Sequence, residues 1–459
     1  MAAGDPPIEG FGRATLWASA VGGALCSLLV AYRLLTMSLE VGSAQGNWVY
    51  VYLQGFQPSF VRSFVYACIA CGLLIAVTPT LVRRLEWWTV VAWLAVGLFV
   101  QGSVRQVTRY SFEQIFVSDG ASSFYSPTLT YDTRTLVRDF EKLRPQLPTH
   151  AQSNMPGKLA LVGALRSLSD RPLRLAWVVI LISNLGGLLL YWFVRELLGD
   201  RDVAITAVIF YLLVPAKLFF FPVLNTITPV IVLACACLWL QSLRTRRLAY
   251  AAGFGVAVYA LAFFDPLGLV MGLLFAALAV HVLRDQEQPW RRFGTLCIIA
   301  AGGFLAAYAV LLVGLQFDLV TTFVSLASDA SAFNTIAGRP YSIWVRQNIV
   351  DFLFGLGVCN AVLATATMAF AANRSRVDRW RDPIVVFSVA CGAILIATDV
   401  IGINRGEVVR LWIFLACFFQ VLAAHACVRL RSRTAVMLVV CTMLLQSVLG
   451  TGMLNFAQP

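Results

Sequence analysis

Long apolar runs recur along the whole chain, and they constrain its fold more than any other feature of the sequence. A helix of about 18 or more mainly apolar residues can cross a bilayer core that is roughly 30 Å thick. Hydrophobic residues make up 59% of the 459 residues and charged residues only 13%, whereas a soluble domain has about 25% charged residues. The sequence therefore predicts an all-α polytopic membrane protein. The thirteen predicted spans are 14–36, 61–82, 87–104, 173–194, 203–221, 229–243, 248–264, 267–283, 293–315, 347–371, 384–402, 411–428 and 435–453.

The connections between alternate spans are rich in arginine, which is typical of cytoplasmic loops. We therefore expect a multi-pass protein of the cell membrane with a cytoplasmic N-terminus. Because Arg13 precedes a full-length span and no small-residue cleavage site follows a short apolar region, we expect the first span to be retained. The arginines concerned are Arg83, Arg84, Arg195, Arg201, Arg244, Arg246, Arg247, Arg284, Arg291, Arg292, those from Arg374 to Arg381 and those from Arg429 to Arg433.

The formal net charge of +12 has the same origin, together with attraction to anionic membrane lipid, so it does not indicate nucleic acid as a partner. All 11 cysteines fall in predicted spans, where we interpret them as small buried apolar residues. The chain has no pair of CxxC motifs and no cluster of cysteine and histidine. The sequence therefore predicts neither a disulfide framework nor a zinc site.

The face opposite the arginines is predicted to hold the long connections, and the longest of them is 105–172. On this topology, 1–104 contains three transmembrane helices, 105–172 is an extracytoplasmic loop and 173–459 contains ten further transmembrane helices. The 105–172 loop is rich in aromatic residues, in which disordered segments are poor, so we expect it to be ordered. The same face is predicted to carry the loops 37–60, 263–268, 316–346 and 402–412.

Two short amphipathic helices are expected inside the 105–172 loop, lying at the membrane surface. Either Asp132 or Thr133 is a suitable N-cap for the first of them. The apolar faces are expected at Leu136, Phe140 and Leu143 for the first helix and at Leu161, Leu165 and Leu168 for the second.

The segment SDGASSFYSP offers a candidate catalytic carboxylate at Asp119. An aspartate in such a loop can act as a general base, while the adjacent Tyr125 presents a flat face to a sugar ring. An Asp-Gly pair is also a common turn, which is the plainer interpretation. Glu113 and Asp132 are alternative bases in the same loop.

The segment THAQSNMPGK places His150 shortly before a Pro-Gly turn and Lys158 directly after it. A lysine beside the first amides of a helix can bind an anion. The alternative is a turn whose lysine faces lipid headgroups. His150 titrates near neutral pH, although an exposed loop histidine often has no special role.

The turn NRGEVVRLW brings Arg405, Glu407 and Arg410 to the end of a span. Ionisable residues that enter the membrane are costly and usually functional. A glutamate paired with one arginine leaves a second guanidinium for a phosphate, or the pair holds two helices together.

Three further polar positions have simpler interpretations. Asp265, in FFDPLG, is expected to cap the helix that follows, with substrate binding as the alternative. Lys217 lies near the outer end of its span, where it can extend to the interface or meet the same anion. The segment GRPYSIWVR is interpreted as part of an interfacial aromatic belt.

No nucleotide-binding or hydrolase motif occurs in the chain: Walker A, GxGxxG, HExxH and GxSxG are all absent. No soluble region is large enough to hold a nucleotide. An enzyme built in this way takes its activated substrate from the membrane.

The arrangement of spans and of the three segments SDGASSFYSP, THAQSNMPGK and NRGEVVRLW resembles the GT-C superfamily of membrane glycosyltransferases. The resemblance covers the architecture of nearly the whole chain and implies a mannosyltransferase-like enzyme of the bacterial cell envelope. Its donor would be a polyprenyl-phosphate sugar, and its acceptor a hydroxyl of a glycan, glycolipid or protein. It implies that Asp119 is the base and that Lys158, Arg405 and Arg410 hold the phosphate. It implies no cofactor and leaves the use of a divalent metal open.

The chain departs from the family pattern in two places. The family's loop usually follows the first span, whereas here it follows the third, which keeps it on the same side. The acidic pair that is frequent in the family is absent, since Asp119 lies between Ser118 and Gly120. A multi-pass transporter, a lipid flippase and an envelope-polymer ligase remain alternatives.

Overall fold

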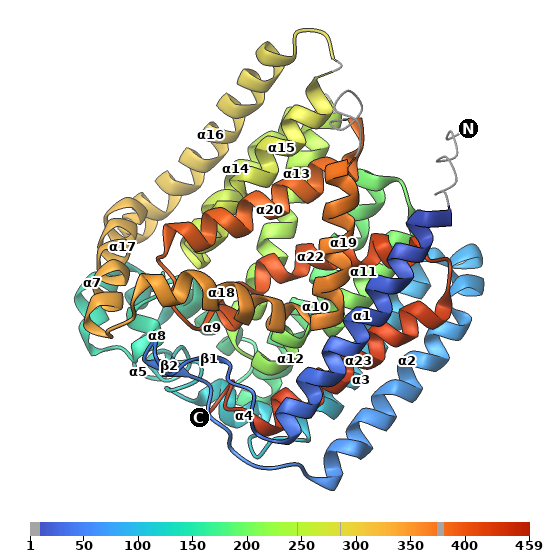
Figure 1. Cartoon of the computed structure of the whole chain (residues 1–459). Helices are drawn as coiled ribbons and strands as arrows, with labels where there is room; N and C mark the ends of the chain where they lie inside the picture. Colours follow the sequence, from blue (N-terminus) through green and yellow to red (C-terminus); the bar gives the residue numbers. More distant parts are fainter. Residues whose placement is uncertain (1–9, 246, 285, 374–380) are drawn as a thin grey trace.

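The computed structural model describes residues 10–245, 247–284, 286–373 and 381–459, and these form a helical bundle (Figure 1). Ten helices in the described segments are long and apolar enough to cross a bilayer, and one bent pair raises the number to eleven. The prediction of an all-α polytopic membrane protein is confirmed at that level. The strands found in this part of the chain are the short antiparallel pair β1 (Gly42–Ser43) and β2 (Trp48–Val49).

All thirteen predicted spans fall on helical segments. Ten correspond to the long apolar helices, and two correspond to shorter apolar helices of 17 residues each, α14 (Leu248–Phe264) and α22 (Ile413–Arg429). The long helices are α1 (Gly10–Leu35), α2 (Pro58–Arg84), α3 (Glu86–Arg105), α10 (Pro172–Leu198), α11 (Arg201–Leu213) with α12 (Pro215–Phe220), α13 (Thr228–Arg244) with the preceding η2 (Leu224–Thr226), η3 (Pro266–Met271) with α15 (Gly272–Leu283), α16 (Pro289–Leu315), α20 (Pro383–Ile401) and α23 (Arg433–Met453).

The predicted span 347–371 is not one straight helix. It is divided between α18 (Tyr341–Leu356) and α19 (Val358–Asn373), which meet at an angle of 107°. The break lies at Gly357, whose φ of +95° is one that a residue with a side chain rarely adopts.

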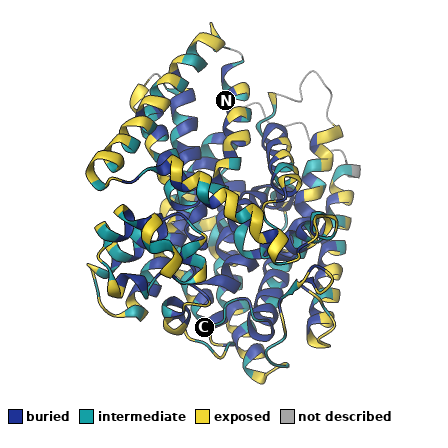
Figure 2. Ribbon diagram, turned by 90° about the vertical axis from the view of Figure 1, so that its left-hand side faces the viewer, coloured by how far each residue is buried: buried dark blue, intermediate teal, exposed yellow. Residues whose placement is uncertain are grey.

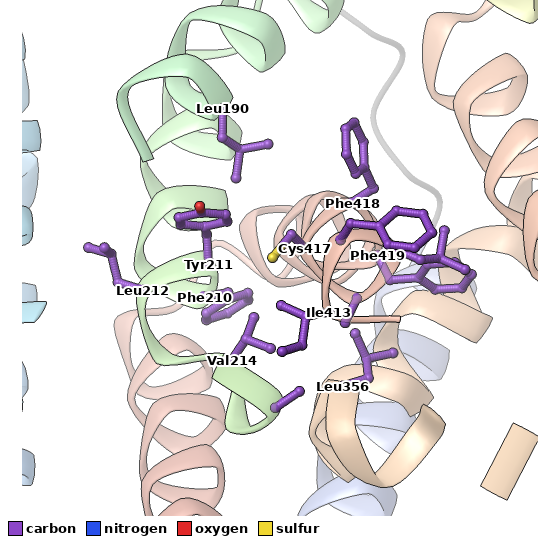
Figure 3. Close-up of a cluster of buried hydrophobic side chains, with 14 of the residues drawn as sticks. Leu190, Phe210, Tyr211, Leu212, Val214, Leu356, Ile413, Cys417, Phe418 and Phe419 are labelled. Atoms are coloured by element: carbon purple, nitrogen blue, oxygen red, sulfur yellow. The ribbon is translucent and has the colours of Figure 1, made fainter. Parts of the chain in front are cut away.

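The centre of the bundle is formed by α11, α12 and α22, whereas α16 lies at its edge. All residues of the apolar 18-residue window within Arg201–Phe220 are buried, against 11% of the corresponding window in α16. Exposed residues accordingly follow the outer helices in Figure 2. In the centre, side chains of α11 and α22 pack against each other and against α10 and α18 (Figure 3). Buried residues of this cluster are Leu190 from α10, Phe210 and Tyr211 from α11, Val214 directly after α11, Leu356 from α18, and Ile413, Cys417 and Phe418 from α22.

The long connections gather at one end of the bundle, which we call the loop end; it consists of 37–57, 106–171, 316–340, 402–412 and 454–459. Hydrogen bonds join these segments: the Gln54 side-chain amide donates to the carbonyl of Val107 at 3.2 Å, and the amide of Asn455 donates to the carbonyl of Val51 at 3.0 Å. The Asn47 amide donates to the carbonyl of Gly338 at 2.7 Å.

The arginine-bearing turns pack together at the opposite end. Arg201 lies 2.9 Å from Glu86, and Arg244 lies 3.2 Å from Glu196. Arg246, Arg374, Arg376 and Arg379 lie outside the described residues.

The 105–172 segment is ordered, but its helices differ from those predicted. The first amphipathic helix is broken at Asp139 into α6 (Thr133–Arg138) and α7 (Phe140–Leu143). Asp132 is its N-cap, accepting from the Thr135 amide at 3.0 Å. The other short elements of the segment are α4 (Phe112–Val117), α5 (Pro127–Thr130), η1 (Arg144–Gln146), α8 (Thr149–Gln152) and α9 (Gly157–Arg166).

The predicted apolar face of the second amphipathic helix is correct at Leu165 and wrong at Leu168. The helix α9 packs against α14 and α6, so its orientation is set by contacts with protein. It buries Leu159, Val162 and Leu165, whereas Leu168 is 76% exposed. The segment 316–346 also differs from an irregular loop, because it contains the 18-residue helix α17 (Leu319–Ile336).

Candidate functional site

Four parts of the chain meet at the loop end: the 118–126 loop, the segment of α8 and α9, the C-terminal end of α14, and the 402–412 turn. The 118–126 loop is shaped by its serines. The hydroxyl of Ser118 accepts from the amides of Gly120 (3.1 Å) and Ala121 (3.0 Å), which folds the loop back on itself. Asp119 is left exposed, and its carboxylate accepts a hydrogen bond from Ser126.

The 118–126 loop is tied to α8 by the backbone. The amide of His150 donates to the hydroxyl of Ser123 at 3.3 Å, and that hydroxyl donates to the carbonyl of Asp119. The backbone of Asp119 is therefore tied to the segment that contains His150, whereas its exposed carboxylate is held by Ser126.

A buried ion pair joins α9 to the end of α14. Lys158 is the second residue of α9 and is 0% exposed; its Nζ lies 3.5 Å from a carboxylate oxygen of Asp265. The same Nζ donates to Asn154 at 2.7 Å, and the hydroxyl of Thr228 donates to Asp265 at 2.7 Å. Burial lowers the pKa of Lys158, and the attraction of Asp265 opposes this shift in part.

This arrangement settles two alternatives. Lys158 faces the protein interior, and the alternative in which it faces lipid headgroups is wrong. Asp265 stands between α14 and η3, but its side chain makes no capping hydrogen bond. Its carboxylate instead forms the ion pair with Lys158 and accepts the hydrogen bond from Thr228.

The second charged group is Arg410 with Glu407. Both lie in the 402–412 turn, where Glu407 takes a left-handed conformation (φ +59°) directly before the short helix α21 (Val408–Leu411). Arg410 forms an ion pair with Glu407, and Arg339 lies 3.6 Å from the other carboxylate oxygen. Burial alone would raise the pKa of Glu407, but the positive charges of Arg410 and Arg339 hold that pKa below its ordinary value.

His150 connects the two charged groups. The guanidinium of Arg410 lies 3.1 Å from its Nε2. An arginine can only donate, so Nε2 accepts and the imidazole is neutral with its proton on Nδ1. Burial, and then the charge of Arg410, lower the pKa of His150 to about 4. The expectation of an exposed histidine that titrates near neutral pH is therefore wrong.

A small cavity of about 10 Å³ lies between the 118–126 loop, α8 and Arg410. This is room for about one water molecule, so a sugar phosphate can enter only if the loop moves. Two buried polar atoms beside the cavity, Oγ of Ser122 and Nε of Arg410, have no hydrogen-bond partner among the described residues. Its polar lining comes from Ser122, His150, Asn154, Asn225 and Arg410.

Some predicted site residues lie apart from this cluster. Arg405 exchanges carbonyl hydrogen bonds with Arg339 (2.9 and 2.7 Å) and stacks on Tyr341, so it stabilises the turn. Tyr125 packs against Phe116 and beneath Arg166, and it is not among the residues that line the cavity.

The alternative bases and Lys217 are also separate. Glu113 is exposed in the first turn of α4, and Asp132 caps α6. Lys217 neither extends to the interface nor joins the cluster: it is fully buried in α12, with Nζ 3.5 Å from the centre of the Tyr211 ring.

Sequence reasoning missed three residues of the site. Arg339, assigned to an aromatic belt, is an ion-pair partner of Glu407. Tyr50, from the 37–60 loop, is buried close enough to Glu407 and Arg410 for their charges to act on its phenol. Asn225 lines the cavity. Only Arg339 carried a signal, a charge within an aromatic segment.

Among the residues that the structure describes, no group of three or more histidine, cysteine, aspartate or glutamate side chains could hold a metal ion. Comparison with models of known protein families and with curated proteins finds no match to this chain. The function must therefore be argued from the charges and contacts of the site.

Proposed function

We propose that the protein is an integral membrane glycosyltransferase that moves a sugar from a polyprenyl-phosphate donor to an extracytoplasmic hydroxyl. The observation that carries the proposal is a loop that bears an exposed carboxylate, Asp119, and is tied through Ser123 to the segment of a buried basic cluster. The basic cluster consists of Lys158, His150, Arg339 and Arg410 with their counter-ions Glu407 and Asp265.

The charge of this cluster suits a phosphate. Its three cationic side chains face two carboxylates, and His150 is neutral, which leaves one positive charge. A polyprenyl-phosphate sugar carries one negative charge, and the polyprenyl phosphate that leaves carries more. As the bond to the phosphate breaks, negative charge develops on it, so a positive site that is already formed stabilises the transition state more than the bound donor, which is the condition for catalysis.

The transfer itself needs one base and one leaving group. Asp119 accepts the proton of the acceptor hydroxyl as the acceptor oxygen bonds to the anomeric carbon of the sugar. The bond from that carbon to the phosphate oxygen breaks, and Arg410 stabilises the charge that develops on the phosphate. Proton transfer to a positioned base typically contributes about 10²–10⁴-fold to the rate.

The proposal includes an orientation. Thirteen spans with a cytoplasmic N-terminus put the loop end outside the cell membrane, where lipid-linked sugars meet glycan, glycolipid or protein acceptors. The packing of the arginine-bearing turns at the other end supports this orientation.

The alternatives are a multi-pass transporter and a lipid flippase. A carrier requires a cavity at mid-depth that opens to either side. The larger cavity, about 760 Å³, is an open groove between 245 and 296 at the arginine end, so it does not favour a carrier.

The test is an assay of the purified full-length protein with a panel of polyprenyl-phosphate sugars and a mixture of envelope acceptors. We expect one donor to be consumed, with release of polyprenyl phosphate. The matched control is Arg405→Ala: the Arg405 guanidinium bonds to backbone carbonyls and to none of the charged groups of the cluster, so this variant should keep donor binding. Failure of every donor either to bind or to react would overturn the proposal.

A further inference from the structure

The helices α2 and α23 pack as an antiparallel pair, and three contacts fix their register. Any side chain at Gly452 would collide with the ring of Phe60, and one at Gly72 would lie against Met437. Between these points, Sγ of Cys68 lies 3.8 Å from Sγ of Cys441.

The two thiols lie near the middle of the membrane. Cys68 is ten residues from the start of α2, or roughly 15 Å along the helix at 1.5 Å per residue. Cys441 is eight residues from the start of α23, or roughly 12 Å from the opposite end. A core of roughly 30 Å puts both beyond the reach of water-soluble thiols and oxidants.

Both thiols are also open to the lipid. Each is partly exposed, and the neighbouring side chains Ile69 and Leu73 are 55% and 68% exposed on the outer surface of the bundle. A reagent dissolved in the bilayer therefore has a path to this pair that it lacks to the buried Cys71, one turn away on α2.

We propose that Cys68 and Cys441 form a modification site, a dithiol that a lipid-soluble quinone oxidises to a disulfide joining α2 to α23. Two S–H bonds break and one S–S bond forms; the two electrons and two protons pass to the quinone, which becomes a quinol. The sulfurs, 3.8 Å apart, must approach by less than 2 Å to reach a bond length of about 2.05 Å.

The proposal predicts a single cross-link in the oxidised protein. The full-length protein in lipid nanodiscs is treated with decylubiquinone, whose ring has no free position for direct addition of a thiol. Remaining thiols are then alkylated, and the digested protein is examined by mass spectrometry. We expect a Cys68–Cys441 linked peptide, with loss of exactly those two alkylated sites.

The variants separate this pair from the other cysteines. Cys68→Ser and Cys441→Ser should each abolish the linked peptide, and the matched control Cys71→Ser should retain it. Absence of the linked peptide in folded wild-type protein, or equal linkage through Cys71, would overturn the proposal. The result does not depend on whether the protein is a glycosyltransferase.

Discussion

The buried pair of Lys158 and Asp265 gives the most quantitative prediction. The change Asp265→Asn keeps the shape of the side chain and its contact with Thr228, but leaves the cation of Lys158 in a fully buried position. Breaking a buried ion pair by removing one partner costs about 3–5 kcal/mol. Release of the lysine proton limits this cost: from a reference pKa of about 10.4, deprotonation at pH 7 costs about 4.6 kcal/mol. We therefore expect the variant to lose about 3–4.6 kcal/mol of stability at pH 7.

The same reasoning gives the pH dependence. Burial depresses the pKa of Lys158 in the folded state, and loss of Asp265 depresses it further. The unfolded chain then binds more protons than the folded chain, so the stability of the variant rises with pH, by up to about 1.4 kcal/mol per pH unit. The wild type should change less over the same range.

The assay is unfolding of the purified protein in detergent, followed by tryptophan fluorescence between pH 6.5 and 9. The double variant Lys158→Met with Asp265→Asn removes the buried charge and should regain most of the lost stability. If Asp265→Asn stayed within about 1 kcal/mol of the wild type at pH 7, or gained nothing at high pH, the buried ion pair would be refuted.

Three further predictions concern the site and the orientation. Because the pKa of His150 is lowered to about 4, the stability of the protein should fall by up to about 3 kcal/mol as the pH drops from 6.5 towards 4. The variant His150→Gln should flatten that part of a profile of melting temperature against pH; an unchanged slope would show that His150 does not cause the pH dependence. Arg410→Ala should weaken binding of the donor by about 1.5–3 kcal/mol in calorimetry, whereas Arg405→Ala should leave it unchanged. Equal losses of donor affinity in the two variants would indicate that both arginines have only a structural role. Thr130→Cys should react with an impermeant maleimide in intact cells and Glu287→Cys only after lysis, and the reverse pattern would invert the topology.

The class of fold could be predicted from the sequence because the length of an apolar run can be seen in the run itself, without knowledge of what it packs against. Each span is visible in its own composition, and so is the Asp132 cap. The break at Gly357 was not visible, since the apolar run continues through it and only the packed structure selects the left-handed conformation. The face of α9 was missed for a related reason: the segment touches protein where lipid was expected.

The site was partly predictable. Charges in an apolar chain drew attention to Lys158, Glu407 and Arg410, and all three lie in the cluster. Which arginine belongs to it was not predictable, because Arg405 and Arg410 have equivalent sequence signals and differ only in their contacts. Pairings such as Lys158 with Asp265 connect positions more than a hundred residues apart, and a single sequence carries no record of them.

The central claim is that Asp119 is the base of a sugar transfer, and Asp119→Asn tests it most directly. An asparagine can still accept the hydrogen bond from Ser126 and suits the same turn, so folding and donor binding should be retained. The measurement is the single-turnover rate of transfer with the donor identified by the panel assay, with Asp132→Asn as the control carboxylate. We predict a fall of about 10²-fold or more for Asp119→Asn and a rate near that of the wild type for the control. A folded Asp119→Asn variant that binds the donor and transfers sugar at nearly the normal rate would contradict the account.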